Sequence, residues 1–345
     1  MSPVVRPPDP DVVAAAAERL AGLATPAGAL GRLGDLAVWI AGAQGVVPPE
    51  PLTNVRLVIF AGDHGVAAHG VSAYPPAITG AMVRTFVAGL AGVNALASAH
   101  DVHVRVLDIG VDEDLTDVPA DVRVHKVRRS SGAIHVEDAL SADETAQSLE
   151  IGRLVAREEI AAGAQLLLGG DMGIGNTTPA AALIAAGLGL PAREVTGRGT
   201  GIDEAALAHK ESVIDQALAR AGDRTADPIE CLTALGSADL AAATGYLVAA
   251  AEAGVPVLLD GVISVACALT ADRIAPGAAT WFAAGHRSTE PAQSLALDKL
   301  GLEPILDLGM RLGEGSGAVA AVPVVRSAIS VLRDVALLAD LMPDA

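Results

Sequence analysis

Six short apolar runs, each ending in glycine or polar residues, most constrain how this chain of 345 residues folds. The runs are rich in Val, Leu and Ile, and apolar and polar residues do not alternate along them. A strand of this kind is buried on both faces, as in a parallel sheet that helices cover on each side. The runs occupy residues 55–65, 103–112, 164–173, 255–264, 279–288 and 304–317.

Helical patterns lie between these runs. Residues 143–163 and 203–222 carry apolar residues at helical spacing, and Asp203 and Gly222 are typical of an N-cap and a helix stop. Strands that alternate with helices predict an α/β fold, here a doubly wound, mostly parallel sheet of about six strands. In such a sheet ligands bind outside the carboxyl ends of the strands. The unusual polar residues of this chain gather at those ends.

Three glycine-rich loops precede helical patterns and predict an anion site. They read "GGDMGIGNTT" at 169–178, "TGRGTGID" at 196–203 and "GEGSGA" at 313–318. Glycines let backbone N–H groups approach an anion, and a helix N-terminus adds unpaired N–H groups and a positive dipole end. The pattern suggests a phosphorylated ligand held from several sides. The alternative for the first loop is a tight turn with an Asn or Thr helix cap.

Glu314 stands between glycines in the third loop. A general base needs the close approach that glycine neighbours allow, and burial would bring its pKa nearer to neutrality. The alternative is a solvent-exposed loop glutamate.

Asp63, His64 and His69 follow the first run and could be metal ligands. No further part of a metal site accompanies them, so a His–Asp pair that shapes a substrate wall is the favoured interpretation. Tyr74, one of two tyrosines, is either a pocket residue or an ordinary surface side chain.

Composition excludes several classes of protein. The net charge of −18 argues against nucleic acid and anionic membrane surfaces, which attract clustered Lys and Arg. The basic stretch 123–129 is interpreted as a solvated edge strand. The start of the chain lacks the basic and apolar segments of a signal peptide. The longest apolar stretches are broken by charged residues, so no uninterrupted apolar span reaches the length of about 18 residues that a bilayer helix needs. We therefore expect a soluble, cytoplasmic protein with reduced cysteines.

Four segments, "FAGDHGV", "GDMGIGNTT", "GRGTGID" and "LDLGMRLGEGSGA", closely resemble those of the nicotinate-nucleotide–dimethylbenzimidazole phosphoribosyltransferases. With two further segments, near the start and before the last run, the resemblance covers nearly the whole chain in order. This family makes the lower-ligand nucleotide of cobalamin. It transfers the phosphoribosyl group of nicotinate mononucleotide to a nitrogen of 5,6-dimethylbenzimidazole, releasing nicotinate and inverting the sugar from β to α.

The resemblance implies a large parallel-sheet domain at 31–309 and a small helical domain from 1–30 with 310–345. It also implies a homodimer that needs no metal or other cofactor. Glu314 matches the catalytic base of the family. The implied nucleotide and phosphate contacts are Asp171, Gly173, Gly175, Asn176, Thr177, Thr178, Gly199, Thr200, Gly201 and Arg311. The implied acceptor-base pocket comprises Asp63, His64, Tyr74, Ala81, Met82, Met310 and Leu312.

Two positions depart from the family pattern. Asp171 replaces a glutamate and shortens the reach of that acid, and Ala81 stands where family members commonly carry glutamine. We therefore expect a wider range of benzimidazole acceptors. Alternatives to this function are the same reaction with a different aromatic base, a non-catalytic nucleotide-binding regulatory protein on the same fold, and a metal-dependent hydrolase using Asp63 and His64.

Overall fold

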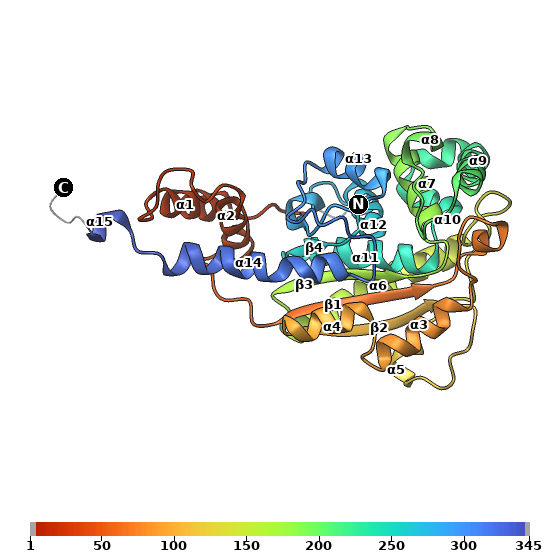
Figure 1. The fold of residues 1–345 in the computed structure, drawn as a ribbon, viewed down its shortest axis with the longest axis horizontal. Helices are drawn as coiled ribbons and strands as arrows, with labels where there is room; N and C mark the ends of the chain where they lie inside the picture. Colours follow the sequence, from red (N-terminus) through yellow and green to blue (C-terminus); the bar gives the residue numbers. More distant parts are fainter. Residues whose placement is uncertain (1–4, 342–345) are drawn as a thin grey trace.

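The structure is a computed structural model that describes residues 5–341. Its centre is a five-stranded sheet with strands β1 Val55–Gly62, β2 Val102–Gly110, β3 Leu166–Met172, β4 Val257–Leu259 and β5 Phe282–Ala284. The strand order is β2-β1-β3-β4-β5, and all neighbouring strands are parallel (Figure 1). The chain enters at β1, which pairs with β2 on one side and with β3 on the other. The strand order therefore reverses between β1 and β3, where such sheets bind ligands.

Helices surround the sheet. They are α1 Pro10–Ala21, α2 Arg32–Gln44, α3 Ile78–Val87, α4 Gly92–Ala99, α5 Ala120–Arg123, α6 Ala142–Ala161, α7 Thr177–Leu188, α8 Ala192–Val195, α9 Glu204–Ala221, α10 Pro228–Leu235, α11 Ala238–Glu252, α12 Val262–Ile274, α13 Pro291–Leu300, α14 Ser316–Asp334 and α15 Leu338–Leu341, with 3-10 turns η1 Gly65–His69, η2 Gly222–Ala226 and η3 Ala278–Trp281. One face of the sheet packs on α3, α4 and α14, and the other on α6, α7, α11 and α12. Coverage of both faces explains why the strands are apolar throughout. The doubly wound α/β class predicted from the sequence is confirmed.

The sixth apolar run does not form a strand. Only its first residues pair with the end of β5, through hydrogen bonds from Ile305 N to Ala284 O and from Leu306 N to Gly285 O. Gly309 and Gly313 then have φ values of +65° and +79°, which take the chain out of the extended conformation. The run is therefore a loop that leads to the start of α14.

The predicted ends of α9 are confirmed. The side chain of Asp203 caps this helix by accepting from Ala206 N at 2.9 Å, and Gly222 follows its last residue. Ser141 and Glu144 form a capping box at the start of α6. Asn176 precedes α7, but its side chain makes no capping hydrogen bond and is thus available for another role.

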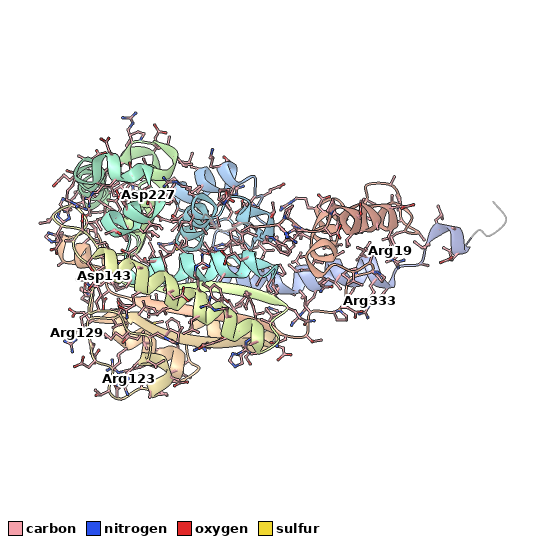
Figure 2. All side chains as sticks on the ribbon, turned by 180° about the vertical axis from the view of Figure 1, so that it is seen from behind. Arg19, Arg123, Arg129, Asp143, Asp227 and Arg333 are labelled. Atoms are coloured by element: carbon pink, nitrogen blue, oxygen red, sulfur yellow. The ribbon has the colours of Figure 1, made fainter. Side chains whose placement is uncertain are left out.

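α1, α2 and α15 lie with the end of α14 beyond one side of the sheet and form a projecting arm (Figure 1). A small core of Ala16, Leu23, Ala37, Ala41, Ala328 and Leu332 holds the arm together. Arg19 of α1 donates to the carbonyls of Leu332 and Arg333 in α14, and Figure 2 shows Arg19 and Arg333 on this arm. Val5, by contrast, belongs to the core beside the sheet. The division at 1–30 with 310–345 stays a prediction, although α2 packs with the arm.

The basic stretch begins with Arg123, the last residue of α5, and continues as a loop to Arg129, so it is not the predicted edge strand. Its side chains pair with acids. Lys126 Nζ lies 2.9 Å from Asp108 Oδ2, and Arg128 Nη1 lies 2.9 Å from Glu144 Oε2. Figure 2 shows Arg123 and Arg129 at the same end of the molecule. The charges of Lys126 and Arg128 are thus compensated within the protein.

Two stretches have the length and apolar composition of a membrane span, residues 78–99 and α14. The first is broken at residues 88–91 into α3 and α4. The second packs along the sheet with 56% of its most apolar window buried in the protein. Buried core helices commonly have the same length and apolar composition as a membrane span.

α6 and α11 pack at very close range because glycines face the partner backbone. A Cβ atom on Gly152 would lie 1.8 Å from Ala242 O, and one on Gly245 would lie 2.0 Å from Leu149 O. No backbone can approach a real Cβ so closely. The pair thus depends on these glycines rather than on large side chains.

We expect Gly152→Ala to lower the free energy of unfolding by about 3 kcal/mol, the upper range for an overpacked core. Urea denaturation measures the change. Gln147→Ala, on the exposed side of the same helix, is the control and should stay within about 0.5 kcal/mol of wild type. Equal stability of the two variants would show that α6 can move away without cost.

Candidate active site

A cavity of about 680 Å³ opens at the carboxyl ends of β3, β4 and β5 and is closed on one side by the loop before α14. Its lining residues predicted from the sequence are Tyr74, Met82, Asp171, Gly173, Asn176, Thr177, Gly199, Thr200, Arg311, Leu312 and Glu314. Segments far apart in the chain thus meet here. The cavity is large enough for a nucleotide-sized ligand and a second small ring.

The remaining predicted residues lie around the cavity rather than in its lining. Gly175 packs against Ala67, Thr178 is buried in the first turn of α7, and Gly201 lies beside Arg311. Asp63 is buried and accepts a hydrogen bond from Asp112 N at 2.8 Å. Met310 is half-buried, and Ala81 is on the exposed side of α3. His64 is buried outside the cavity lining, where it meets Asp239.

Glu314 is a buried carboxylate at the cavity wall, and its backbone has a φ of +65°. Such a conformation is costly for a residue other than glycine and is typical of functional sites. Close packing holds the turn, since a Cβ on Gly170 would lie 2.4 Å from Glu314 O. The side chain reaches α4, where Oε2 accepts from Val93 N at 3.1 Å. Burial raises the pKa of Glu314, the hydrogen bond from Val93 opposes this, and the charge of Asp260 adds to it.

Asp260, directly after β4, fixes the loop that carries Glu314. Its carboxylate accepts from Gly315 N at 3.1 Å, Gly317 N at 2.8 Å and Ala318 N at 3.1 Å. These are the unpaired N–H groups at the start of α14. His286, after β5, places Nε2 3.4 Å from Asp260 Oδ1. Burial disfavours the charged form of Asp260, but the bond and charge of His286 and the backbone N–H groups outweigh it and lower the pKa.

Asp260 and His286 are not among the site residues predicted from the sequence, although their places in the sequence point to the ligand-binding edge of the sheet. Each follows an apolar run, where a parallel sheet presents its ligand-binding residues. No glycine-rich loop marks them, and a motif search therefore passes over them.

Lys210 of α9 lies behind Thr177 in the cavity wall. Its Nζ is buried and donates to Thr177 Oγ1 at 2.8 Å and to Gly197 O at 3.0 Å. Burial lowers the pKa of Lys210 to about 8, although the charge of Glu290 opposes this. Glu290 also accepts from Gly199 N at 2.8 Å. Two of the predicted anion loops are thus joined through a buried lysine and glutamate that the sequence did not single out.

Two loops meet at the rim of the cavity. Thr200 Oγ1 accepts from Ala73 N at 3.0 Å and lies 3.5 Å from Ser72 Oγ. Arg311 Nη1 lies 3.4 Å from Gly199 O in the same loop as Thr200. Tyr74 is 54% exposed and lines the cavity. It is a pocket residue at the rim, so both interpretations from the sequence describe part of its environment.

The cavity lining contains both polar and apolar side chains. The polar ones include Asn176, Thr177, Thr200, Glu290 and Arg311. The apolar ones include Ile78, Met82, Met172 and Leu312, together with the ring of Tyr74. The arrangement fits a polar, phosphorylated ligand beside a flat apolar one, with the buried carboxylate of Glu314 in the same lining.

Asp63, His64 and His69 were only the alternative candidates for a metal site. Within residues 5–341, no three His, Cys, Asp or Glu side chains are grouped so as to hold a metal ion. His69 packs instead on His135, with ring centres 4.5 Å apart. His64 pairs with Asp239 rather than with Asp63 alone.

Comparison with known proteins gives consistent matches. A family model described as Phosphoribosyltransferase matches residues 5–341. The nicotinate-nucleotide–dimethylbenzimidazole phosphoribosyltransferase of Mycolicibacterium paratuberculosis is 53% identical over 97% of this chain and 95% of its own length. The enzyme of the same name from Mycobacterium leprae is 49% identical over 97% of this chain and 95% of its own length. The crystal structure of CobT from Thermus thermophilus has a TM-score of 0.92 at 44% identity, covering 96% of this chain and 98% of that one.

We expect Asp260→Ala to lower the free energy of unfolding by about 3 kcal/mol or more. Three buried N–H donors lose their acceptor, at about 1–3 kcal/mol for each group left unpaired. Urea denaturation measures the stability, and faster hydrogen exchange at Gly315, Gly317 and Ala318 locates the change.

Asp227→Ala is the matched control, because Asp227 caps the more exposed start of α10 by accepting from Ile229 N and Glu230 N. Loss of such a cap costs about 1 kcal/mol. If both variants lose the same stability and exchange at α14 is unchanged, Asp260 does not anchor the loop.

Proposed function

This chain belongs to the family of nicotinate-nucleotide–dimethylbenzimidazole phosphoribosyltransferases and is a phosphoribosyltransferase, and from that premise we propose its reaction. It transfers the phosphoribosyl group of nicotinate mononucleotide to 5,6-dimethylbenzimidazole. The products are α-ribazole 5′-phosphate and nicotinate. The observation that carries the proposal is Glu314, a buried carboxylate on the wall of a cavity lined by both polar and apolar side chains. Family membership sets aside the non-catalytic regulatory protein and the metal-dependent hydrolase.

The polar side chains of the cavity lining form the proposed nucleotide site. Backbone N–H groups of the glycine-rich loops and the side chains of Asn176, Thr177, Thr200 and Arg311 bind the 5′-phosphate and ribose. Lys210 adds a positive charge directly behind Thr177. These groups position the nucleotide, and positioning is a large part of catalysis when two reactants must meet.

The apolar side chains of the cavity lining form the proposed site of the acceptor ring. Tyr74, Ile78, Met82 and Leu312 offer apolar contacts to a benzimidazole, and Glu314 lies in the same lining. Ala81 is outside the lining, so the acceptor is selected by these apolar side chains rather than by a polar group at that position. Asp63 and His64 support the wall from outside instead of touching the acceptor.

Chemistry begins with a leaving group that needs no acid. The nicotinate ring of the mononucleotide is a cationic pyridinium, and its nitrogen takes the electron pair of the breaking C1′–N bond as nicotinate departs. The sugar acquires oxocarbenium character, as in glycoside cleavage. One benzimidazole nitrogen forms the new bond to C1′ on the opposite face, which inverts the configuration. The other nitrogen gives its proton to Glu314, whose raised pKa suits a general base.

The protein is further proposed to be soluble in the cytoplasm and to act as a homodimer, as the sequence resemblance implies. The projecting arm is consistent with a second copy, because its exposed Leu338 and Leu341 leave apolar surface uncovered in one chain.

Incubation with nicotinate mononucleotide and 5,6-dimethylbenzimidazole tests the reaction. We expect release of nicotinate and an equal amount of riboside phosphate by chromatography, with the α configuration by NMR. Nicotinate release without a riboside would indicate hydrolysis and would contradict the proposed transfer.

Competition between 5,6-dimethylbenzimidazole, unsubstituted benzimidazole and adenine tests the breadth of the acceptor pocket. Apolar contacts discriminate by only about 10- to 200-fold, so benzimidazoles with varied substituents should react. Preference for adenine would support the alternative acceptor. Exclusion of every base but one by more than about a thousandfold, well beyond that range, would contradict the wide pocket.

Glu314→Gln should lower kcat by roughly 10²- to 10⁴-fold, the usual contribution of a general base, with little effect on the KM for nicotinate mononucleotide. In wild type, kcat falls as the pH drops through the raised pKa of Glu314, because the base becomes protonated. The variant should lack this acidic limb. Glu303→Gln, an exposed glutamate paired with Arg32, is the control. A kcat within about tenfold of wild type would exclude Glu314 as the base.

A further inference from the structure

Glu314 takes the place of a missing cap at the start of α4. The residue before this helix is Ala91, and its side chain makes no capping hydrogen bond. A capping side chain usually accepts from the backbone N–H of the second or third residue of the helix. In α4 the second residue is Val93, and its N–H donates to Oε2 of Glu314 at 3.1 Å, across 221 positions of the chain.

The loop that carries Glu314 lies in close contact with α4 and β3. A Cβ on Gly92 would lie 2.9 Å from Cδ2 of Leu312 and 3.7 Å from Oε2 of Glu314. The first distance is shorter than a real Cβ atom accepts, so a side chain at this position displaces Leu312. A Cβ on Gly170 would lie 2.4 Å from the carbonyl oxygen of Glu314. Glycines in two elements thus allow the loop to approach both of them.

A single hydrogen bond holds the carboxylate of Glu314. Among the residues that the structure describes, Glu314 makes no ion pair, and Val93 N is the one donor to its side chain. Asp260, by comparison, receives three N–H groups and lies beside His286. Because Oε2 of Glu314 is bonded and the residue lines the cavity, Oε1 is the oxygen that remains for a ligand.

We propose that the start of α4 positions the proposed base, with the N–H of Val93 fixing Oε2 of Glu314 so that Oε1 accepts the proton of the acceptor ring. Val93 is a positioning residue, since it acts through Glu314 and only by its backbone. Gly92 assists because it has no side chain to separate the loop from the helix. This inference rests on the proposed function in taking Glu314 as the base.

A neutral donor suits this role better than a cation. An arginine beside a carboxylate lowers the pKa of that group by about 1–3 pH units, which weakens it as a base near neutral pH. A backbone N–H at a helix start orients the oxygen and stabilises its charge to a smaller extent. Burial of Glu314 outweighs the bond from Val93, so the pKa stays raised. The carboxylate is therefore oriented without losing its basicity.

The hydrogen bond is kept when the proton is transferred. The N–H bond of the acceptor ring breaks, its electron pair stays on the ring nitrogen, and the proton joins Oε1. Oε2 is then the carbonyl oxygen of a carboxylic acid and still accepts from Val93 N. The bond is weaker in this state, because hydrogen bonds to an ionised group are the stronger ones. The N–H of Val93 therefore reports the protonation of Glu314.

The charged groups near Glu314 determine the sign of a pH effect. Those in the cavity lining are Asp171, Asp260, His286, Glu290 and Arg311. Of these, Asp260 acts on Glu314, and its charge adds to the effect of burial in raising the pKa. α4, with the sequence GVNALASA, brings no charged side chain. Loss of the donor at Val93 should therefore raise the pKa of Glu314 further, without a cation of α4 to compensate.

NMR tests the inference without an assay of transfer. In ¹⁵N-labelled protein the amide proton of Val93 should move downfield as the pH rises and Glu314 ionises, because the bond strengthens. Glu314→Gln should abolish this movement. The amide of Ala206 is the control, since it donates to Asp203 at 2.9 Å at the start of α9 and should respond alike in both proteins. A Val93 amide that does not respond in wild type, or responds equally in Glu314→Gln, would overturn the inference.

Removal of the donor gives a second readout. Val93→Pro deletes this N–H, and proline is tolerated in the first turn of a helix because no intrahelical bond is lost there. We expect kcat to fall by up to about 100-fold, the order of loss for a misplaced reacting group. The acidic limb of kcat should move to higher pH, while the KM for nicotinate mononucleotide changes little.

Two variants separate the N–H from the packing around it. Val93→Ala keeps the N–H and should keep the acidic limb at the pH of wild type. Asn94→Ala removes the neighbouring bond from Ala91 N, at 3.2 Å, and should leave kcat unchanged. An acidic limb that stays in place in Val93→Pro, or moves equally in Val93→Ala, would contradict the role of the N–H.

These outcomes are separable from the proposed reaction. If the Val93 amide follows Glu314 but no riboside forms, the hydrogen bond stands and the reaction fails. If transfer occurs while the amide does not follow Glu314, only the positioning role is wrong. If Val93→Pro does not fold, the NMR titration of wild type and Glu314→Gln still decides.

Discussion

The hydrogen bonds between the carboxylate of Asp260 and the start of α14 hold the whole site in place. Three backbone N–H groups and His286 converge on this one side chain. The anchored turn includes Glu314 in a left-handed conformation, which costs on the order of 1–3 kcal/mol and persists only when its surroundings impose it. Asp260 supplies that constraint from the end of β4. The position of the proposed catalytic carboxylate is therefore set by the sheet, through a second acid that performs no proton transfer itself.

The cavity lining contains four carboxyl groups, and each is stabilised by a different partner. Asp260 has a helix terminus and His286, Glu290 has Gly199 N and the charge of Lys210, and Glu314 has Val93 N. Asp171 has the side-chain amide of Asn176. Such individual compensation lets a site for an anionic ligand be built in a protein whose net charge is −18. It also leaves Glu314, the proposed base, with a raised pKa.

The sequence predicted the layers of this fold because buried parallel strands and amphipathic helices leave local patterns. It predicted Glu314 and the loops at Asn176 and Thr200 for a similar reason, since glycines mark close backbone approach. It could not predict Lys210 or Glu290, because a buried charged residue can be recognised only when its partner is known. Their partners, Thr177 and Gly199, are 33 and 91 residues away in the sequence. The prediction of a strand at 304–317 was wrong because the apolar residues there resemble those of a strand, whereas the glycines among them form a loop.

α14 runs from the cavity into the projecting arm without interruption. Its 19 residues span about 28 Å at the usual helical rise. Asp260 binds one end, and Arg19 binds the carbonyls near the other. The loop that carries the proposed base leads directly into α14, and α1 of the arm is bound to the last turn of the same helix. The arm is therefore joined to the sheet through the same helix whose first turn Asp260 anchors.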